Sequence, residues 1–138
     1  MIVTPIEQKV EKICESIIVK DYLRKHNIVG ENFYTCSMLS VFGTKYCKDQ
    51  VVILPESDNS FMQFGKIEEL LSYDNCAYLI YKKMSAVYCS KSDLYFLNDL
   101  EDSELIPIHQ LACFRPLETY LVGESLREAV SLRNYVLA

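Results

Sequence analysis

The amino-acid sequence predicts a mainly β protein, in which an N-terminal amphipathic α-helix precedes a small antiparallel β-barrel of the SH3-like or Tudor-like kind. Apolar residues recur with helical spacing only near the start of the chain. From Phe33 onward, short runs rich in Tyr, Phe, Val and Ile alternate with turn-forming residues. Several short strands at such intervals are typical of a small barrel or a strongly bent sheet. We therefore expect a helix over residues 4–27 and a barrel over residues 33–138, forming one compact unit.

The helix has a recognisable start in the sequence TPIE. Thr4 suits the N-cap, Pro5 the first helical position, and Glu7 lies three residues after the cap. Basic residues near Lys25 suit its end. The helix has one apolar face, which contains Ile6, Val10, Ile13, Ile17 and Ile18. Packing on the chain's own barrel is the simpler interpretation, but this face is also the candidate binding surface for a partner protein or a second copy of the chain.

The expected strands follow one another at short intervals. They cover residues 33–42, 50–55, 61–71, 76–83, 93–98, 104–108, 112–115 and 128–137. The acidic run NDLEDSE, residues 98–104, indicates the solvated tip of a hairpin or, alternatively, a docking segment for a basic partner. Pro107 and Pro116 favour strand edges or turns, and one turn of 3₁₀ helix is expected between them at residues 109–111.

Gly65 interrupts the strand pattern FMQFGKIEELL. A glycine inside a strand usually marks a bulge or a sharp bend. We expect a bulge at Gly65 that bends a long strand, so that Phe64 and Ile67 both face the core and Lys66 faces solvent. Close approach of a ligand to the backbone is the alternative explanation.

Length and charge limit the classes of function. The chain has 138 residues, half of them apolar, which is enough for one domain with a substantial core. Its formal net charge of -5 argues against nucleic acid as the main partner, although it does not exclude a local basic surface. No apolar stretch approaches the roughly 18–20 residues of a membrane span, and the N-terminus lacks the pattern of a signal peptide. An intracellular location, nuclear or cytoplasmic, is expected.

The cysteines and histidines predict no metal site, no cofactor and no catalysis. The six cysteines include no C-x-x-C pair, and His26 and His109 are isolated, so we expect free thiols in a reducing compartment. Cys113 lies four residues from His109, which leaves a Cys-dependent hydrolase as a third hypothesis. The sequence has no nucleophile elbow and no glycine-rich phosphate loop, and a structural thiol is the simpler interpretation.

Residues 41–137 carry a longer pattern. It contains a tyrosine-initiated strand with VVIL, then FGKI, an aromatic segment, CFRPLETY and a closing LRNY. The matching positions are Tyr46, Val51 to Leu54, Phe64 to Ile67, Leu111, Phe114 to Leu117, Tyr120 and Leu132 to Tyr135. This pattern resembles a C-terminal β domain of uncharacterised animal proteins that are often linked to mobile elements or to zinc-finger segments. The resemblance implies no catalytic residues. Where such proteins often have HAYEV, this chain has SDLYF, so no role of that histidine carries over.

Two functions follow as hypotheses. The first is a non-catalytic protein–protein interaction domain of a transposon-derived or chromatin-associated regulatory protein. It would act as an adaptor or a homodimer, through the helix face or through an unpaired strand edge. The alternative is a barrel that reads a modified peptide or single-stranded RNA through aromatic rings and lysines. The alternative ligand-binding residues are Tyr78, Tyr81, Lys82, Lys83, Tyr88 and Tyr95, with Tyr73 and Phe96 as further cage candidates.

Overall fold

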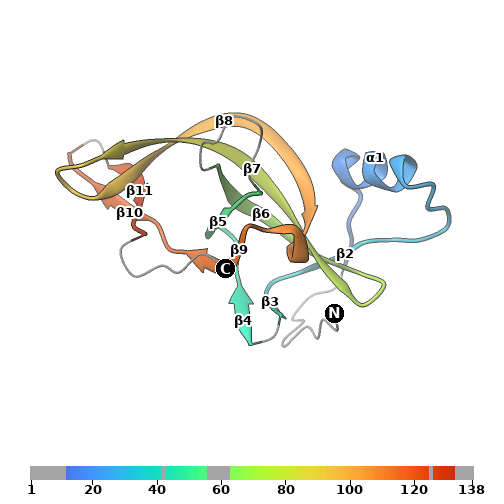
Figure 1. The fold of residues 1–138 in the computed structure, drawn as a ribbon. Helices are drawn as coiled ribbons and strands as arrows, with labels where there is room; N and C mark the ends of the chain where they lie inside the picture. The colour runs from blue at the N-terminus through green and yellow to red at the C-terminus, as the bar shows by residue number, and fades with distance from the viewer. Residues whose placement is uncertain (1–11, 42, 56–62, 125, 133–138) are drawn as a thin grey trace.

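The computed structural model of the protein describes residues 12–41, 43–55, 63–124 and 126–132 (Figure 1). These residues are mainly β, as predicted, with one α-helix and one 3₁₀ turn. The helices are α1 (Ile17–Lys25) and η1 (Ile108–Gln110). The first strands are β1 (Lys12–Ile13), β2 (Tyr34–Cys36), β3 (Leu39–Val41), β4 (Thr44–Tyr46) and β5 (Val51–Ile53). The later ones are β6 (Phe64–Tyr73), β7 (Cys76–Cys89), β8 (Leu94–Pro107), β9 (Cys113–Leu117), β10 (Tyr120–Val122) and β11 (Arg127–Val130).

Nine of these strands form one antiparallel sheet, in which seven follow one another in the order β1-β2-β6-β7-β8-β11-β10. β5 pairs with the first part of β6 and also with β9, whereas β3 and β4 form a separate hairpin. The long strands β7 and β8 arch over the molecule and reach beyond β6, where they meet β11 and β10 (Figure 1). The order runs from β1 to β10 without joining these two ends, so the predicted closed barrel is wrong for the part of the chain that the structure describes. The SH3-like relationship stays a prediction.

The sheet is covered on both faces, and this explains the runs of consecutive apolar residues. In β5, Val52 belongs to one apolar core together with Ile67 and Tyr81, while its neighbours Val51 and Ile53 belong to a second core. Successive side chains of a strand point to opposite faces, so these two cores lie on opposite sides of the sheet. The second side also carries a third cluster, in which α1 packs on the sheet.

The helix is shorter than predicted. α1 begins at Ile17, after Ser16, whose hydroxyl caps it by accepting a hydrogen bond of 3.2 Å from the backbone N–H of Ile18. Lys12–Ile13, expected inside the helix, forms β1 instead, and the Cys14 N–H donates to the carbonyl of Phe33 at 2.7 Å. Backbone pairing with β2 therefore replaces helical bonding before Ser16. Residues 4–11 of the predicted helix lie outside the described residues.

Several strand assignments also change. The predicted strand 33–42 is two strands, β2 and β3, which belong to different sheets. The predicted strands 93–98 and 104–108 are one strand, β8, so the acidic run at 98–104 is not a hairpin tip. Two carboxylates of this run form ion pairs with lysines on the neighbouring strand β7: Asp99 with Lys82 and Glu104 with Lys83. These ion pairs allow the acidic segment to remain part of a hydrogen-bonded strand. β4 and β10 lie outside every predicted strand: β4 is in a segment expected to be a turn, and β10 is in a segment for which no strand is predicted. The predicted 3₁₀ turn is confirmed one residue earlier, as η1.

Gly65 does not form the predicted bulge. The register between β6 and β7 shifts between Ile67 and Glu69 instead. Phe64 and Ile67 are both buried, as expected, but in different cores on opposite faces. Lys66 is not left to solvent, because its ammonium group bonds to the carboxylate of Glu128 at 2.9 Å. Gly65 is needed for a different reason: a Cβ there would lie 2.7 Å from the ring atom Cδ2 of Tyr81.

Candidate functional site

The aromatic residues proposed for ligand binding lie in three separate places. Tyr78 belongs to the cluster beneath α1, where its ring centroid lies 4.9 Å from that of Phe33 and 5.8 Å from that of Tyr22. Tyr73 stacks on the same Phe33 at 4.8 Å. Burial and the neighbouring Tyr22 raise the pKa of Tyr78. These rings contact one another, so they are packing partners that join the helix to the sheet.

Tyr81 lies on the opposite face of the sheet, in the core that contains Ile67. Its side chain is only 5% exposed, which leaves no ring face for a ligand. Its hydroxyl donates to Oε2 of Glu104 at 3.0 Å. Burial is the largest cause that raises the pKa of this phenol, and the charge of Glu104 adds to it.

Tyr88 and Tyr95 form the third group, at the far end of β7 and β8. Their ring centroids lie 5.0 Å apart, and the hydroxyl of Tyr88 donates to Asp93 at 2.7 Å. Tyr95 also contacts Phe64 in the second core, at 5.6 Å. Only this pair of the proposed ring residues combines mutual contact with substantial exposure, and two rings at this angle do not enclose a cation.

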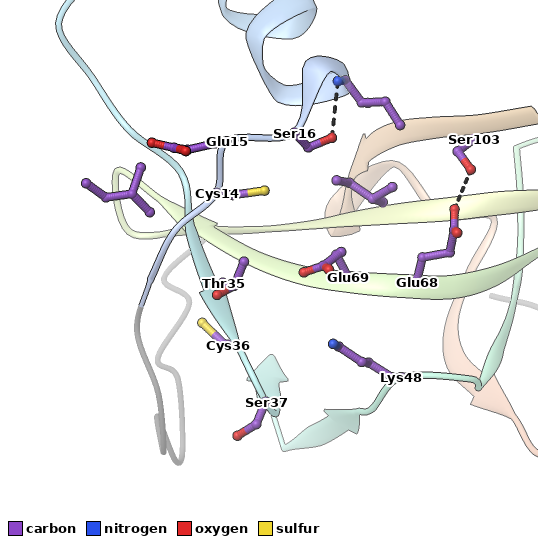
Figure 2. A pocket seen from close by; sticks show the side chains of 13 residues that line it. Cys14, Glu15, Ser16, Thr35, Cys36, Ser37, Lys48, Glu68, Glu69 and Ser103 are labelled. Atoms are coloured by element: carbon purple, nitrogen blue, oxygen red, sulfur yellow. Dashed lines mark hydrogen bonds between the residues drawn. The ribbon is translucent and has the colours of Figure 1, made fainter.

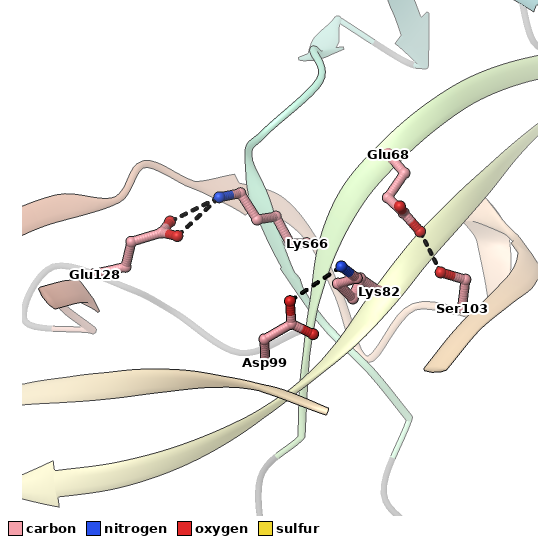
Figure 3. A network of polar contacts seen from close by, with 6 residues as sticks. All are labelled: Lys66, Glu68, Lys82, Asp99, Ser103 and Glu128. Atoms are coloured by element: carbon pink, nitrogen blue, oxygen red, sulfur yellow. Dashed lines mark hydrogen bonds and ion pairs between the residues drawn. The ribbon is translucent and has the colours of Figure 1, made fainter. Parts of the chain in front are cut away.

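The proposed basic residues lie in ion pairs. Lys82 contacts Asp99 at 3.0 Å on one face of the sheet, and Lys83 contacts Glu104 at 2.8 Å on the other. Figure 3 shows Lys82 within a band of polar contacts that also contains the Lys66–Glu128 pair and a hydrogen bond from Ser103 to Glu68. Because nearby carboxylates balance these ammonium groups, they do not form the basic surface that a phosphate backbone requires.

The Lys83–Glu104 pair predicts a pH window for part of the stability. The hydrogen bond from Lys83 lowers the pKa of Glu104 below its usual 4.5, and the same bond raises the pKa of Lys83 above 10.5. The stabilisation is therefore complete between these values. It is lost as pH falls through the folded pKa of Glu104 or rises through that of Lys83. Both groups are substantially exposed, so Glu104→Gln should cost only about 0.2–1 kcal/mol at pH 7.

Urea titrations at several pH values check this prediction. The difference in unfolding free energy between wild type and Glu104→Gln should shrink towards zero below pH 4. Lys83→Gln serves as the matched variant, and it should remove most of the effect of a further Glu104→Gln change. A difference that persists unchanged at pH 3 would show that the carboxylate charge does not contribute.

A hollow lies between the segment that leads into α1 and the sheet (Figure 2). It has a volume of about 960 Å³. Ile18 and Ile80 contribute apolar surface, while Glu68, Glu69 and Lys48 contribute charge. A smaller hollow of about 580 Å³ lies between α1 and β8 and shares Ile18 and Ser103 with it. No histidine is among the lining residues that the structure describes, so neither hollow offers an imidazole as a general base.

The residues of the predicted apolar helix face do not all lie on one helix. Ile13 lies in β1 and is 50% exposed, and Ile17 at the start of α1 is 73% exposed. Ile18 is half-buried against the cluster beneath α1. Ile6 and Val10 lie outside the described residues. The three described isoleucines thus belong to two different elements, and only two of them offer free apolar surface.

A second exposed apolar surface lies at the other end of the sheet, and sequence reasoning missed it. The registers place Val87 opposite Phe96, Phe96 opposite Ala129, and Ala129 opposite Tyr120. These four residues form an apolar row on one face, across β7, β8, β11 and β10. Val87 is 59% exposed and Tyr120 is 55% exposed, so both ends of the row are open.

The edge strand β10 adds apolar side chains beside this row. Leu121 is 62% exposed and points to the face opposite Tyr120, and Leu126 in the turn before β11 is 62% exposed. We call Val87, Tyr88, Tyr120, Leu121 and Leu126 the distal surface; Figure 1 shows the strands that carry it gathered at one end of the sheet. Five of the nine large apolar residues that are exposed in the described chain are in this set, which spans both faces of this end of the sheet: Val87 and Tyr120 lie on one face, Tyr88 and Leu121 on the other. The tripeptide YLV could have indicated β10, but only pairing reveals it as an edge.

The described residues include cysteines, a histidine on η1 and carboxylates that bear on metal and thiol chemistry. They contain no group of three or more His, Cys, Asp or Glu side chains placed to hold a metal ion. The five cysteines whose side chains are described, Cys14, Cys36, Cys47, Cys76 and Cys89, are free thiols. His109 lies exposed on η1, whereas the side chain of Cys113 is outside what the structure describes, so the proposed Cys–His pair stays untested.

A membrane-crossing helix is not found among the described residues. The chain was compared with protein-family models, with curated proteins and with solved structures, and none of the three comparisons gives a match.

Proposed function

We propose that this protein is a non-catalytic interaction module that binds a protein partner through the distal surface. The observation that carries the proposal is the exposure of Val87 and Tyr120 at the two ends of one apolar row, together with Leu121, which is exposed on the opposite face of the same edge strand. Apolar patches of this kind mark interaction sites on soluble domains. Tyr120, at the edge end of the row, offers a large ring for burial together with a polar hydroxyl group.

The module would act as an adaptor or regulatory domain of a transposon-derived or chromatin-associated protein. This assignment rests on the resemblance of the VVIL, FGKI and CFRPLETY motifs and on nothing in the arrangement of the strands. The reader of modified peptides or RNA remains the alternative. No observation favours it, because its rings are divided among three sites and its lysines face carboxylates.

Affinity purification of the tagged chain from cells that express it tests the proposal. Val87→Asp with Tyr120→Asp places charge in the distal surface. We expect proteins retained by the wild type to fall about tenfold or more, because each hot spot typically contributes over 1 kcal/mol. The matched control is Val29→Asp, at a position 91% exposed and outside the distal surface. Thermal melts establish that each variant is folded. Equal retention by all three proteins would contradict the proposal.

A further inference from the structure

β10 is an edge strand with an unusual composition. In the described part of the chain it pairs with β11 on one side only. Natural edge strands are commonly protected by lysine, proline, a bulge or short length. β10 has only the last of these, because its residues are Tyr120, Leu121 and Val122. Its side chains alternate between two faces, and apolar surface is available on both: Tyr120 extends the apolar row, and Leu121 is exposed on the opposite side.

We propose that β10 accepts an added strand from a partner protein, and that the partner segment has an apolar centre with a lysine or arginine at each end. This inference rests on the proposed function and identifies the partner's chemistry. Main-chain hydrogen bonds to the open edge supply affinity in strand addition, while side chains at alternate positions supply specificity. Because β10 has only three residues, the groups that flank the strand contribute much of its selectivity for a partner.

Those flanking groups are acidic. Glu118 lies two residues before β10 and Glu124 two residues after it, and both are exposed. Two nearby cations already have contacts: Lys66 bonds Glu128 at 2.9 Å, and the guanidinium of Arg127 lies 4.9 Å from the centre of the Phe96 ring. Glu118 accepts a hydrogen bond from the amide of Gln50 at 2.8 Å, which leaves its negative charge in place. Opposite charges attract at close range, so a partner segment with basic flanks is preferred beside these two carboxylates.

The same charges exclude a second copy of the chain as the occupant. Symmetric antiparallel pairing of two β10 strands about Leu121 brings Glu118, just before the strand in each copy, towards Glu124 in the turn just after the strand of the other. Like charges brought together in this way oppose the pairing. The edge is therefore complementary to a different chain and not to itself.

A charge exchange tests this geometry without a known partner. Glu124→Lys turns both repulsive pairs into Glu–Lys pairs, so this variant should form a dimer in sedimentation velocity at concentrations where the wild type is a monomer. The double variant Glu118→Lys, Glu124→Lys opposes lysine to lysine and should return to the monomer. A wild-type dimer built on β10, or the absence of a dimer for Glu124→Lys, would overturn the inference.

Two synthetic peptides test the partner's chemistry directly. Lys-Thr-Val-Ile-Val-Thr-Lys should bind the wild type about tenfold more tightly than Glu-Thr-Val-Ile-Val-Thr-Glu, a difference of about 1.4 kcal/mol. The double lysine variant should reverse this preference. Equal binding of both peptides by the wild type would refute the role of the flanking charges. If no preference is found but protein capture still depends on Val87 and Tyr120, the inference fails while the proposed function stands. If the peptide preference is found but protein capture does not depend on Val87 and Tyr120, only capture through the distal surface is refuted.

Discussion

Replacing Phe33 with alanine should destabilise the protein by about 3–5 kcal/mol, the range typical for removal of a buried phenylalanine. Phe33 is fully buried, and its ring contacts those of Tyr22, Tyr73 and Tyr78. Its loss leaves a cavity at the point where α1 meets the sheet, and the surrounding rings cannot all close around it. A loss of this size is a large fraction of the stability of an ordinary domain.

Chemical denaturation followed by far-ultraviolet circular dichroism measures the effect. The neighbouring Tyr34→Ala is the matched control, because Tyr34 is 40% exposed and should cost well under half as much as Phe33→Ala. A loss below about 1 kcal/mol for Phe33→Ala would contradict a tightly packed contact between α1 and the sheet.

Gly65→Ala should destabilise the protein by about 1–3 kcal/mol, the usual cost of overpacking a core. The new Cβ would lie 2.7 Å from Cδ2 of Tyr81, 3.0 Å from its Cγ and 3.2 Å from Cδ2 of Leu54. The Tyr81 ring cannot move freely, because it is buried and its hydroxyl is bonded to Glu104. A larger side chain at position 65 must therefore displace the ring or separate β6 from β7.

A double variant identifies the cause. Tyr81→Val removes the ring that meets the new methyl group, so Gly65→Ala should cost much less in that background. Equilibrium unfolding in urea of the four proteins gives the coupling energy. Additive effects would mean that Gly65 is required for its backbone alone and not for the close approach of Tyr81.

The secondary structure was largely predictable, because it depends on local patterns. Short aromatic and β-branched runs predicted the strands around Val52 and Ile80, and two prolines predicted η1. The helix start was not predictable from capping alone, since Thr4 and Ser16 are both suitable N-caps. Ser16 caps α1, and backbone pairing between β1 and β2 precedes it. Lys12–Ile13 is a strand because it pairs with Tyr34 and Thr35, which are distant in sequence, so local patterns could not decide between helix and strand there.

The candidate site was less predictable, because it depends on which face each side chain occupies. Register shifts occur between Ile67 and Glu69 and between Lys82 and Met84, and each shift changes the alternation along a strand. Tyr78 and Tyr81 lie three residues apart in β7, so alternation alone places them on opposite faces, but which residues of β6 and β8 lie beside them depends on these shifts. The position of β10 at the edge of the sheet was equally unpredictable from the sequence. A strand is an edge strand when it has a neighbour on one side only, and this depends on the order of all strands in the sheet.

Amide hydrogen exchange, resolved by residue in NMR spectra, tests the central claim that the sheet is open at β10. We predict that amides of residues 120–122 that point away from β11 exchange nearly as fast as unstructured amides, while those in the middle of β7, around Leu79, are strongly protected. Slow exchange at all three positions of β10 would mean that another strand already occupies this edge, and it would contradict both the open sheet and the binding surface proposed there.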